Sequence, residues 1–172
     1  MELTSLIDKL KSAFCIDGVD EMPQALYKAA MDHDVSAFDA YVDVVGGDLG
    51  LDYLQKVYQY YMADREDLGQ DFTPESLAKL LGTITKDDDE VVDLCAGSGA
   101  LTIQAWRVNP DRHFTCYEID DTAVCFLLFN LCVRNIGGQV IHRDLFDGSK
   151  IRSYMLKASD KYSEVQIDGD NQ

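Results

Sequence analysis

The sequence has 172 residues, of which 47% are hydrophobic, and 15 basic against 31 acidic side chains give it a formal net charge of −16. This length and hydrophobic content predict one domain, at most one and a half, with a substantial core, and exclude disorder of the main body. The acidic balance argues against a chain that grips nucleic acid unaided, because such binding draws much of its affinity from neutralised phosphates.

The sequence also argues against a membrane protein and against a metal-binding protein. No apolar run approaches the ~18 residues of a membrane span, and the acidic, amphipathic start at 1–5 does not resemble a signal peptide. The five cysteines form no C-x-x-C and the three histidines are isolated, so we expect no metal site. Reduced, mostly buried thiols in a cytoplasmic protein are the expected state.

Residues 1–68 are predicted to be a helical N-terminal region. Apolar stripes that begin at Leu3, Met22, Phe38 and Leu51 indicate four helices. The segment 36–39 resembles a capping box, which predicts that the third helix begins there. The tyrosines of this region would suit base stacking, but with so few cations among them core packing or a partner interface is the better interpretation.

The second unit, 69–172, is expected to begin with a further helix. Thr73 is a suitable N-cap and Pro74 a suitable first helical residue. The apolar stripe of this helix comprises Leu77, Leu80, Leu81 and Ile84. The charge run at 86–90 reads as a solvated link to the part of the chain that follows.

The segment 91–100 carries the strongest signal in the sequence. An apolar run ends at Asp93, small residues follow, and a helix is predicted from Ala100, which is a strand, a tight turn and a helix start. Gly97 and Gly99 lack Cβ, so the turn can adopt positive φ and a ligand can lie against it. The loop lacks the lysine of a phosphate-binding loop and the third glycine of the dinucleotide fingerprint.

Two further strands are predicted to end beside acids. Residues 113–117 lead to Glu118, about 20 residues after the glycines and suited to bind ribose hydroxyls, and 139–143 lead to Asp144. Three such strands would place three carboxylates at one sheet edge, although each acid has a simpler alternative as a helix cap or turn former. The helix at 121–134 is apolar nearly all round, which predicts that it lies between the sheet and another layer. The N-terminal helices are expected either to supply that layer or to cover the sheet edge.

These motifs resemble those of S-adenosylmethionine-dependent methyltransferases. The loop at 93–100 is closest to the D-P-A-C-G-S-G form of N6-adenine DNA methylases, especially the modification subunits of type I restriction systems. Residues 69–77 resemble the G-x-[FY]-[FY]-T-P segment of those proteins, Glu118 with the helix that bears Asn130 resembles their second motif, and 142–146 resembles their third. The resemblance implies a Rossmann-like α/β sheet after the helical region.

The same resemblance implies S-adenosylmethionine or S-adenosylhomocysteine as the cofactor. Asp93, Ala96, Gly97 and Thr73 would face its methionine part, Glu118 its ribose and Asp144 its adenine amino group. The full set of implied cofactor residues is Phe72, Thr73, Pro74, Asp93, Ala96, Gly97, Ser98, Gly99, Glu118, Ile119, Asp144 and Leu145.

The sequence departs from this family at the catalytic motif, [ND]-P-P-[YF], because no proline follows Pro110. The one strand expected after Asp144, at 162–167, ends at Asp168, which is a weak catalytic candidate without an aromatic neighbour to stack a base. We therefore expect a partial sheet of about four strands. We also expect that the chain is inactive alone, and that it reaches DNA only with a second subunit, either a protein partner or a second copy.

Three functional classes stay open. The chain is an N6-adenine DNA methylase or part of one, a non-catalytic cofactor-binding or interaction subunit of a split methyltransferase, or a small methyltransferase that acts on RNA or protein.

Overall fold

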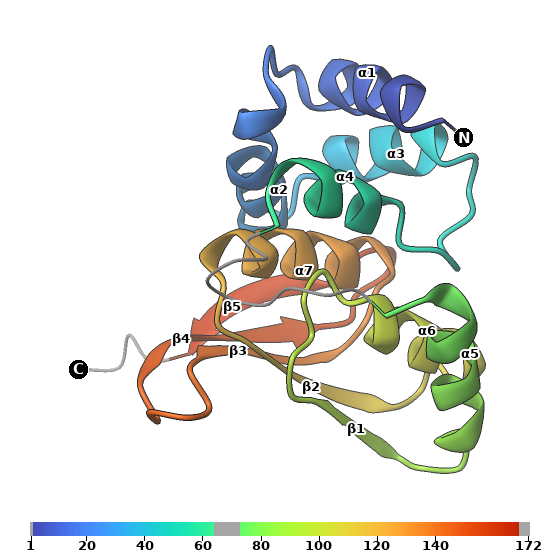
Figure 1. The fold of residues 1–172 in the computed structure, drawn as a ribbon, viewed down its shortest axis with the longest axis vertical. Coiled ribbons are helices and arrows are strands. Elements are labelled where there is room, and N and C mark those ends of the chain that lie inside the picture. Colours follow the sequence, from blue (N-terminus) through green and yellow to red (C-terminus); the bar gives the residue numbers. More distant parts are fainter. Residues whose placement is uncertain (1, 64–72, 169–172) are drawn as a thin grey trace.

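The fold comprises a helical layer and a five-stranded sheet, shown in the computed structural model of Figure 1, which describes residues 2–63 and 73–168. The helices before the sheet are α1 (Leu3–Phe14), the 3₁₀ turn η1 (Val19–Glu21), α2 (Met22–Met31), α3 (Val35–Val44), α4 (Tyr53–Tyr61) and α5 (Glu75–Ile84). The remaining elements are β1 (Glu90–Asp93), α6 (Ala100–Val108), β2 (His113–Glu118), α7 (Asp121–Val133), β3 (Gly138–Arg143), β4 (Lys150–Lys157) and β5 (Glu164–Asp168). This arrangement confirms the predicted α/β class with its helical N-terminal region.

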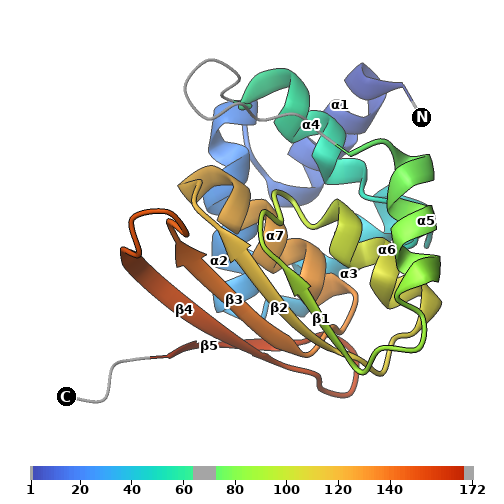
Figure 2. The same ribbon diagram turned by 60° about the horizontal axis from the view of Figure 1, so that its bottom comes forward.

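The sheet has the order β1-β2-β3-β4-β5, and its two halves run differently. Strands β1, β2 and β3 pair in parallel, whereas β4 and β5 are each antiparallel to the preceding strand. The loops after β1, β2 and β3 therefore meet at one edge, as predicted. In Figure 2 the described helices lie behind the sheet, all on one of its faces.

Strand β4 was not predicted, and the sheet has five described strands rather than about four. Its sequence mixes cations with apolar residues and shows no regular alternation. In the fold, Tyr154 and Leu156 are buried while Met155 and Lys157 are exposed. This alternation is what a strand with one buried face requires.

Helix α7 lies between the sheet and the N-terminal helices, as its composition predicted (Figure 2). Phe129 in its middle is fully buried, and its ring contacts Phe14, Phe38 and Tyr41 at centroid distances of 5.3, 5.3 and 5.2 Å. The helical region and the sheet therefore share one hydrophobic core. Tyr41 belongs to this core, which agrees with the packing interpretation of that tyrosine.

Two helix starts differ from the expectation. Helix α3 begins at Val35, and its N-cap is Asp34, whose carboxylate accepts from Ser36 N and Ala37 N, so the capping box at 36–39 is wrong. Helix α5 begins at Glu75 with Pro74 at the N-cap position, one residue later than Thr73. Both errors are shifts of one or two residues in the position of a helix end, which is the least certain part of a sequence-based prediction.

Helix α5 buries its small residues rather than its leucine stripe. Ala78 and Gly82 are buried, and a Cβ on Gly82 would meet Gln104 O of α6 at 2.7 Å, so the two helices pack closely there. Leu77, Leu80, Leu81 and Ile84 are 46, 55, 39 and 68% exposed. Among the described helices, none is long and apolar enough to cross a bilayer.

Candidate functional site

The loop after β1 forms a tight turn that opens α6. Gly97 and Gly99 have φ values of +55° and +100°, in the region that favours glycine, as the sequence predicted. Gly99 N donates to Ala96 O at 2.8 Å, and Ala96 N donates to Tyr117 O of β2 at 2.9 Å. The turn is therefore fixed both to itself and to the neighbouring strand.

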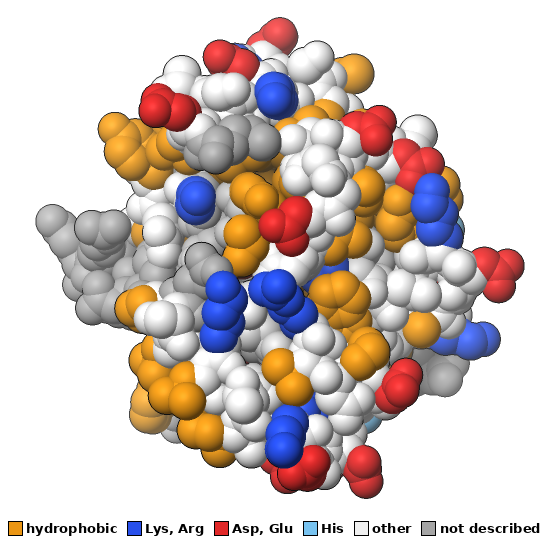
Figure 3. All heavy atoms as spheres, turned by 90° about the vertical axis from the view of Figure 1, so that its right-hand side faces the viewer, with side chains coloured by type: hydrophobic (Ala, Val, Ile, Leu, Met, Phe, Trp, Pro, Cys, Tyr) orange, Lys and Arg blue, Asp and Glu red, His pale blue; other side chains and the backbone are white. Residues whose placement is uncertain are grey.

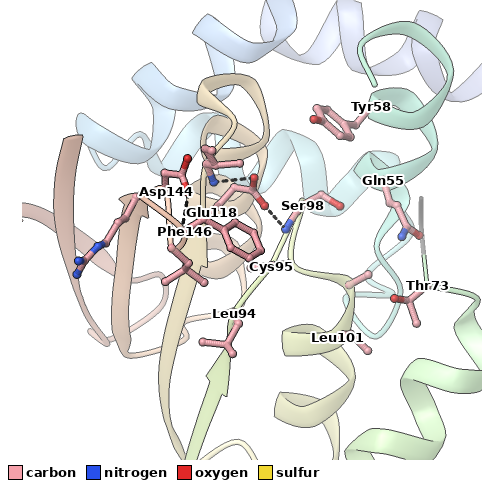
Figure 4. A pocket seen from close by; sticks show the side chains of 16 residues that line it. Gln55, Tyr58, Thr73, Leu94, Cys95, Ser98, Leu101, Glu118, Asp144 and Phe146 are labelled. Atoms are coloured by element: carbon pink, nitrogen blue, oxygen red, sulfur yellow. Dashed lines mark hydrogen bonds between the residues drawn. The ribbon is translucent and has the colours of Figure 1, made fainter. Parts of the chain in front are cut away.

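Glu118 at the end of β2 joins this turn to the next loop. Its Oε2 accepts from Gly97 N at 2.6 Å, and its Oε1 accepts from Ile119 N and Asp120 N at 2.8 and 2.9 Å. The side chain is only 8% exposed. A carboxylate held by three backbone N–H groups has one orientation, and Glu118 lines the cavity beside it (Figure 4).

The loop after β3 forms the second wall of the site. Asp144 Oδ1 accepts from Phe146 N at 2.7 Å, so this acid is a turn former as well as a residue of the cavity wall. Phe146 is fully exposed at the mouth of the cavity, where Figure 4 shows its ring beside Glu118. A planar ligand that entered here would meet this aromatic face.

These loops enclose a cavity of ≈ 290 Å³ at the carboxyl ends of the parallel strands. Eight of the predicted cofactor residues line it: Thr73, Ala96, Gly97, Ser98, Glu118, Ile119, Asp144 and Leu145. Its other walls include Leu94, Cys95, Leu101 and Arg143. The structure thus brings together acids and small residues that are far apart in the sequence.

The other predicted residues lie elsewhere. Asp93 lies behind the turn, where its Oδ2 accepts from Thr102 Oγ1 at 2.9 Å, and burial raises its pKa. Gly99 lies against α7, since a Cβ there would meet Leu127 Cδ1 at 2.9 Å. Pro74 lines a neighbouring hollow with Thr73, and Phe72 lies outside the described residues.

Asp168 is exposed at the end of β5, the outermost strand of the far half of the sheet. Strand β5 lies two strand positions beyond β3, whose following loop lines the cavity, and two strand spacings are about 10 Å. Asp168 does not line the cavity.

Helix α4 contributes residues that the sequence analysis did not assign. Gln55 and Tyr58 line the cavity from the N-terminal region, and Figure 4 shows both on the side opposite Asp144. No local pattern marks them, because the contact joins segments about forty residues apart. The apolar stripe of α4 predicted its helix but not which ligand-facing residues that helix would carry.

The cavity offers no activated nucleophile among its described residues. Cys95 lines it, but burial, followed by the charges of Glu118 and Asp93, raises the pKa of its thiol, so the thiol stays protonated at neutral pH. Within the described part of the chain, no three His, Cys, Asp or Glu side chains are grouped to hold a metal ion. The site is thus suited to binding a ligand by backbone N–H groups, carboxylates and small apolar surfaces.

A glycine turn between a strand and a helix, with a carboxylate at the end of the next parallel strand, defines a nucleotide-type ligand site in an open α/β sheet. The family model for the methyltransferase small domain matches residues 60–156, more than half of the chain. The chain therefore belongs to the methyltransferase small domain family, which confirms the predicted Rossmann-like methyltransferase fold and implies an S-adenosylmethionine-type cofactor. No curated protein and no solved structure gave a match. The narrower resemblance to N6-adenine DNA methylases stays a prediction.

Proposed function

We propose that this chain binds S-adenosylmethionine in the cavity at the carboxyl ends of β1, β2 and β3, as the cofactor-binding part of an enzyme that methylates adenine amino groups in DNA. The observation that carries the proposal is the contact between Gly97 N and Glu118 Oε2 at 2.6 Å, which joins the glycine turn to the acid of the next strand. Two independent sequence signals meet at this one contact.

The residues fit the cofactor at the turn. Gly97 lines the cavity, and a Cβ built on it would have no atom within 4 Å, so the space above the turn is open to a ligand. Gly97 is also at positive φ, a conformation that a side chain resists. A glycine that leaves this volume open allows a ligand to approach the backbone of the turn closely.

Each part of the cofactor has candidate partners on the cavity wall. Thr73, Ala96 and Gly97 would hold the methionine part, Glu118 the ribose hydroxyls and Asp144 the adenine amino group. When bound, S-adenosylmethionine supplies a methyl group on a positively charged sulfur. The side chains around it exclude water and orient the ligand, and Glu118 is fixed for this task by its three backbone bonds.

Methyl transfer to the proposed acceptor, an adenine amino group in DNA, would require a second subunit. An enzyme that modifies a base holds the extruded base between stacking side chains and at its hydrogen-bonding edge. Asp168 is the acid nearest to where the family motif would fall in sequence, and it lies on the far strand of the sheet. Figure 3 shows the face of the molecule that lies on the right-hand side of Figure 1. Its described lysine and arginine side chains are scattered among hydrophobic and acidic ones and form no continuous stripe.

A non-catalytic cofactor-binding subunit is the second candidate, favoured because Asp168 is not among the residues that line the cavity. In that case the chain would bind the cofactor and contribute no group to the acceptor.

The two candidates are separated by a transfer assay with tritium-labelled S-adenosylmethionine and adenine-containing duplex DNA. For the chain alone we expect ultraviolet cross-linking of the labelled cofactor to the protein and no label on DNA. Label on DNA should appear when proteins encoded beside it are added, if the chain is half of an enzyme. Robust labelling of DNA by the purified chain would contradict the need for a second subunit, and absence of cofactor cross-linking would contradict the proposal itself.

A further inference from the structure

The segment between α3 and α4, residues 48–52, reaches across from the N-terminal region to the helices of the sheet. Gly50 O accepts from Gln104 Nε2 of α6 at 2.7 Å. Leu49 O and Leu51 O accept from Arg134 Nε and Nη2, just after α7, at 2.8 and 2.9 Å. Gln104 and Arg134 are both buried, so this segment is held by polar groups that have left water.

Asp52 ends this segment and contacts the cofactor turn. As the N-cap of α4, its Oδ1 accepts from Gln55 N at 2.9 Å. Its Oδ2 accepts from Ser98 Oγ at 2.7 Å, although the two residues are 46 positions apart. Ser98 is the residue after Gly97 and is 2% exposed. One carboxylate therefore both begins α4 and holds the turn.

Asn130 of α7 completes the cluster from the other side. Its Nδ2 donates to Asp52 Oδ1 at 3.0 Å and to Ser98 O at 2.8 Å. Arg134 Nη1 donates to Asn130 Oδ1 at 2.9 Å, which fixes the amide so that its donor faces Asp52 and Ser98. Ser98 is thus held at its hydroxyl by Asp52 and at its carbonyl by Asn130.

The surroundings of Asp52 raise the pKa of its carboxyl above the ordinary value, because burial outweighs the other effects. The charge of Arg134 and the bonds from Ser98, Gln55 and Asn130 lower this pKa and offset part of the rise. A capping role alone does not require burial, since the exposed Asp34 caps α3 equally well. The half-buried position of Asp52 is explained by its contact with Ser98.

We propose that Asp52 is a positioning residue for the cofactor cavity, which acts through Ser98 to hold the turn in the conformation that places Gly97 N on Glu118. This inference rests on the proposed function, and it makes the N-terminal region a structural part of the cofactor site. The turn would then depend on three elements far apart in the sequence: the start of α4, the end of β2 and the middle of α7.

The experiment compares Asp52→Ala with Asp34→Ala, since both remove an N-cap carboxylate from a helix of the N-terminal region. Asp34→Ala should lower Tm by roughly 2–4 °C, the usual effect of losing a cap in a chain of this size. Asp52→Ala should lower Tm by more, because it also leaves Ser98 and Asn130 without their acceptor. Calorimetric titration with S-adenosylhomocysteine should give about tenfold weaker binding for Asp52→Ala and a change within about twofold for Asp34→Ala, because unpairing a buried polar group is costly. Equal affinities in the two variants would overturn the proposal.

Amide hydrogen exchange provides a readout that needs no cofactor. The amide of Gly97 donates to Glu118, and the amide of Gly99 donates to Ala96 O. The exchange of both amides should therefore accelerate in Asp52→Ala and stay unchanged in Asp34→Ala. If wild-type protein binds no S-adenosylhomocysteine, the proposed function fails while this comparison still tests the role of Asp52. Unchanged exchange in Asp52→Ala would contradict that role.

A milder variant covers the case in which Asp52→Ala does not fold. Ser98→Ala removes the hydroxyl that donates to Asp52 and leaves the backbone bond to Asn130 in place. It should accelerate exchange at Gly97 and Gly99 in the same direction. In the double variant with Asp52→Ala the effects should not add, because both changes break one contact. Full additivity would show that Asp52 acts by another route, which would also contradict the proposal.

Discussion

Strands β1–β3 and strands β4–β5 belong to one sheet, but the loops that follow them carry different residues. The three parallel strands lead into the glycine turn, Glu118 and Asp144, which converge on one cavity. The antiparallel strands contribute no residue to that cavity. They contribute Tyr154 and Leu156 to the core instead.

The difference follows from strand direction. Parallel neighbours need a crossover helix, so each of their carboxyl ends leads into a loop at the same edge of the sheet. An antiparallel neighbour runs back across the sheet, so the loop that follows it lies at the opposite edge. The parallel half therefore collects ligand-binding groups, whereas the antiparallel half extends the core.

The largest expected effect is on the packing of the parallel half. Gly138 is at φ +152°, and a Cβ there would lie 2.0 Å from Phe114 O of the adjacent strand. Gly138→Ala should therefore separate β2 from β3 and destabilise the protein by about 3 kcal/mol, measured by urea denaturation. Gly137→Ala is the control, because its nearest neighbours would lie at 3.8 Å, an ordinary contact. Similar losses in the two variants would contradict this account of the β2–β3 contact.

The second effect concerns the turn itself. Gly97→Val should reduce S-adenosylhomocysteine binding by about a hundredfold or more while the protein remains folded, because the valine would occupy the open space above the turn. Gly47→Val is a matched control: Gly47 is at φ +77°, and a Cβ there would also have nothing within 4 Å. Both variants carry the same backbone strain, but Gly47 does not line the cavity.

Replacement of Glu118 should have a smaller effect. Glu118→Ala leaves the N–H groups of Gly97, Ile119 and Asp120 without their acceptor. The expected loss is ~1–3 kcal/mol of binding free energy, or roughly five- to 150-fold in affinity, measured by calorimetry. An unchanged affinity would remove Glu118 from the site.

The smallest effects separate the two halves of the sheet most directly. Phe146→Ala should weaken cofactor binding about threefold, since a stacked aromatic contact contributes roughly 0.5–1.5 kcal/mol. Asp168→Ala, on the antiparallel half, should leave binding unchanged because Asp168 does not line the cavity. A loss of affinity in Asp168→Ala that matched or exceeded the loss in Phe146→Ala would break the distinction between the halves.

The sequence predicted the parallel half well, because its signals are local. Each of its strands is an apolar run followed by an acid, and the glycines of the turn stand beside the first of them. Strand β4 was not predicted because Arg152 and Lys157 interrupt its run of apolar residues. A strand with one buried face mixes polar and apolar residues, so its sequence resembles that of a charged loop.

The contribution of α4 to the site could not be predicted from local sequence patterns, for a different reason. Asp52 has the residue type of an N-cap, and that much is visible in the sequence. Its contact with Ser98 spans 46 residues and exists only because α7 brings the helical layer and the turn together. Long-range polar contacts of this kind leave no periodic pattern to detect.

The central claim is that the turn after β1 and the acid after β2 form a binding site for an S-adenosylmethionine-type cofactor. Its most direct test is calorimetric titration of the wild-type chain, Gly97→Val and Gly47→Val with S-adenosylhomocysteine under identical conditions. The account predicts one saturable site in the wild type, the same site in Gly47→Val and none in Gly97→Val. Absence of binding by the wild type, or equal binding by all three proteins, would contradict it.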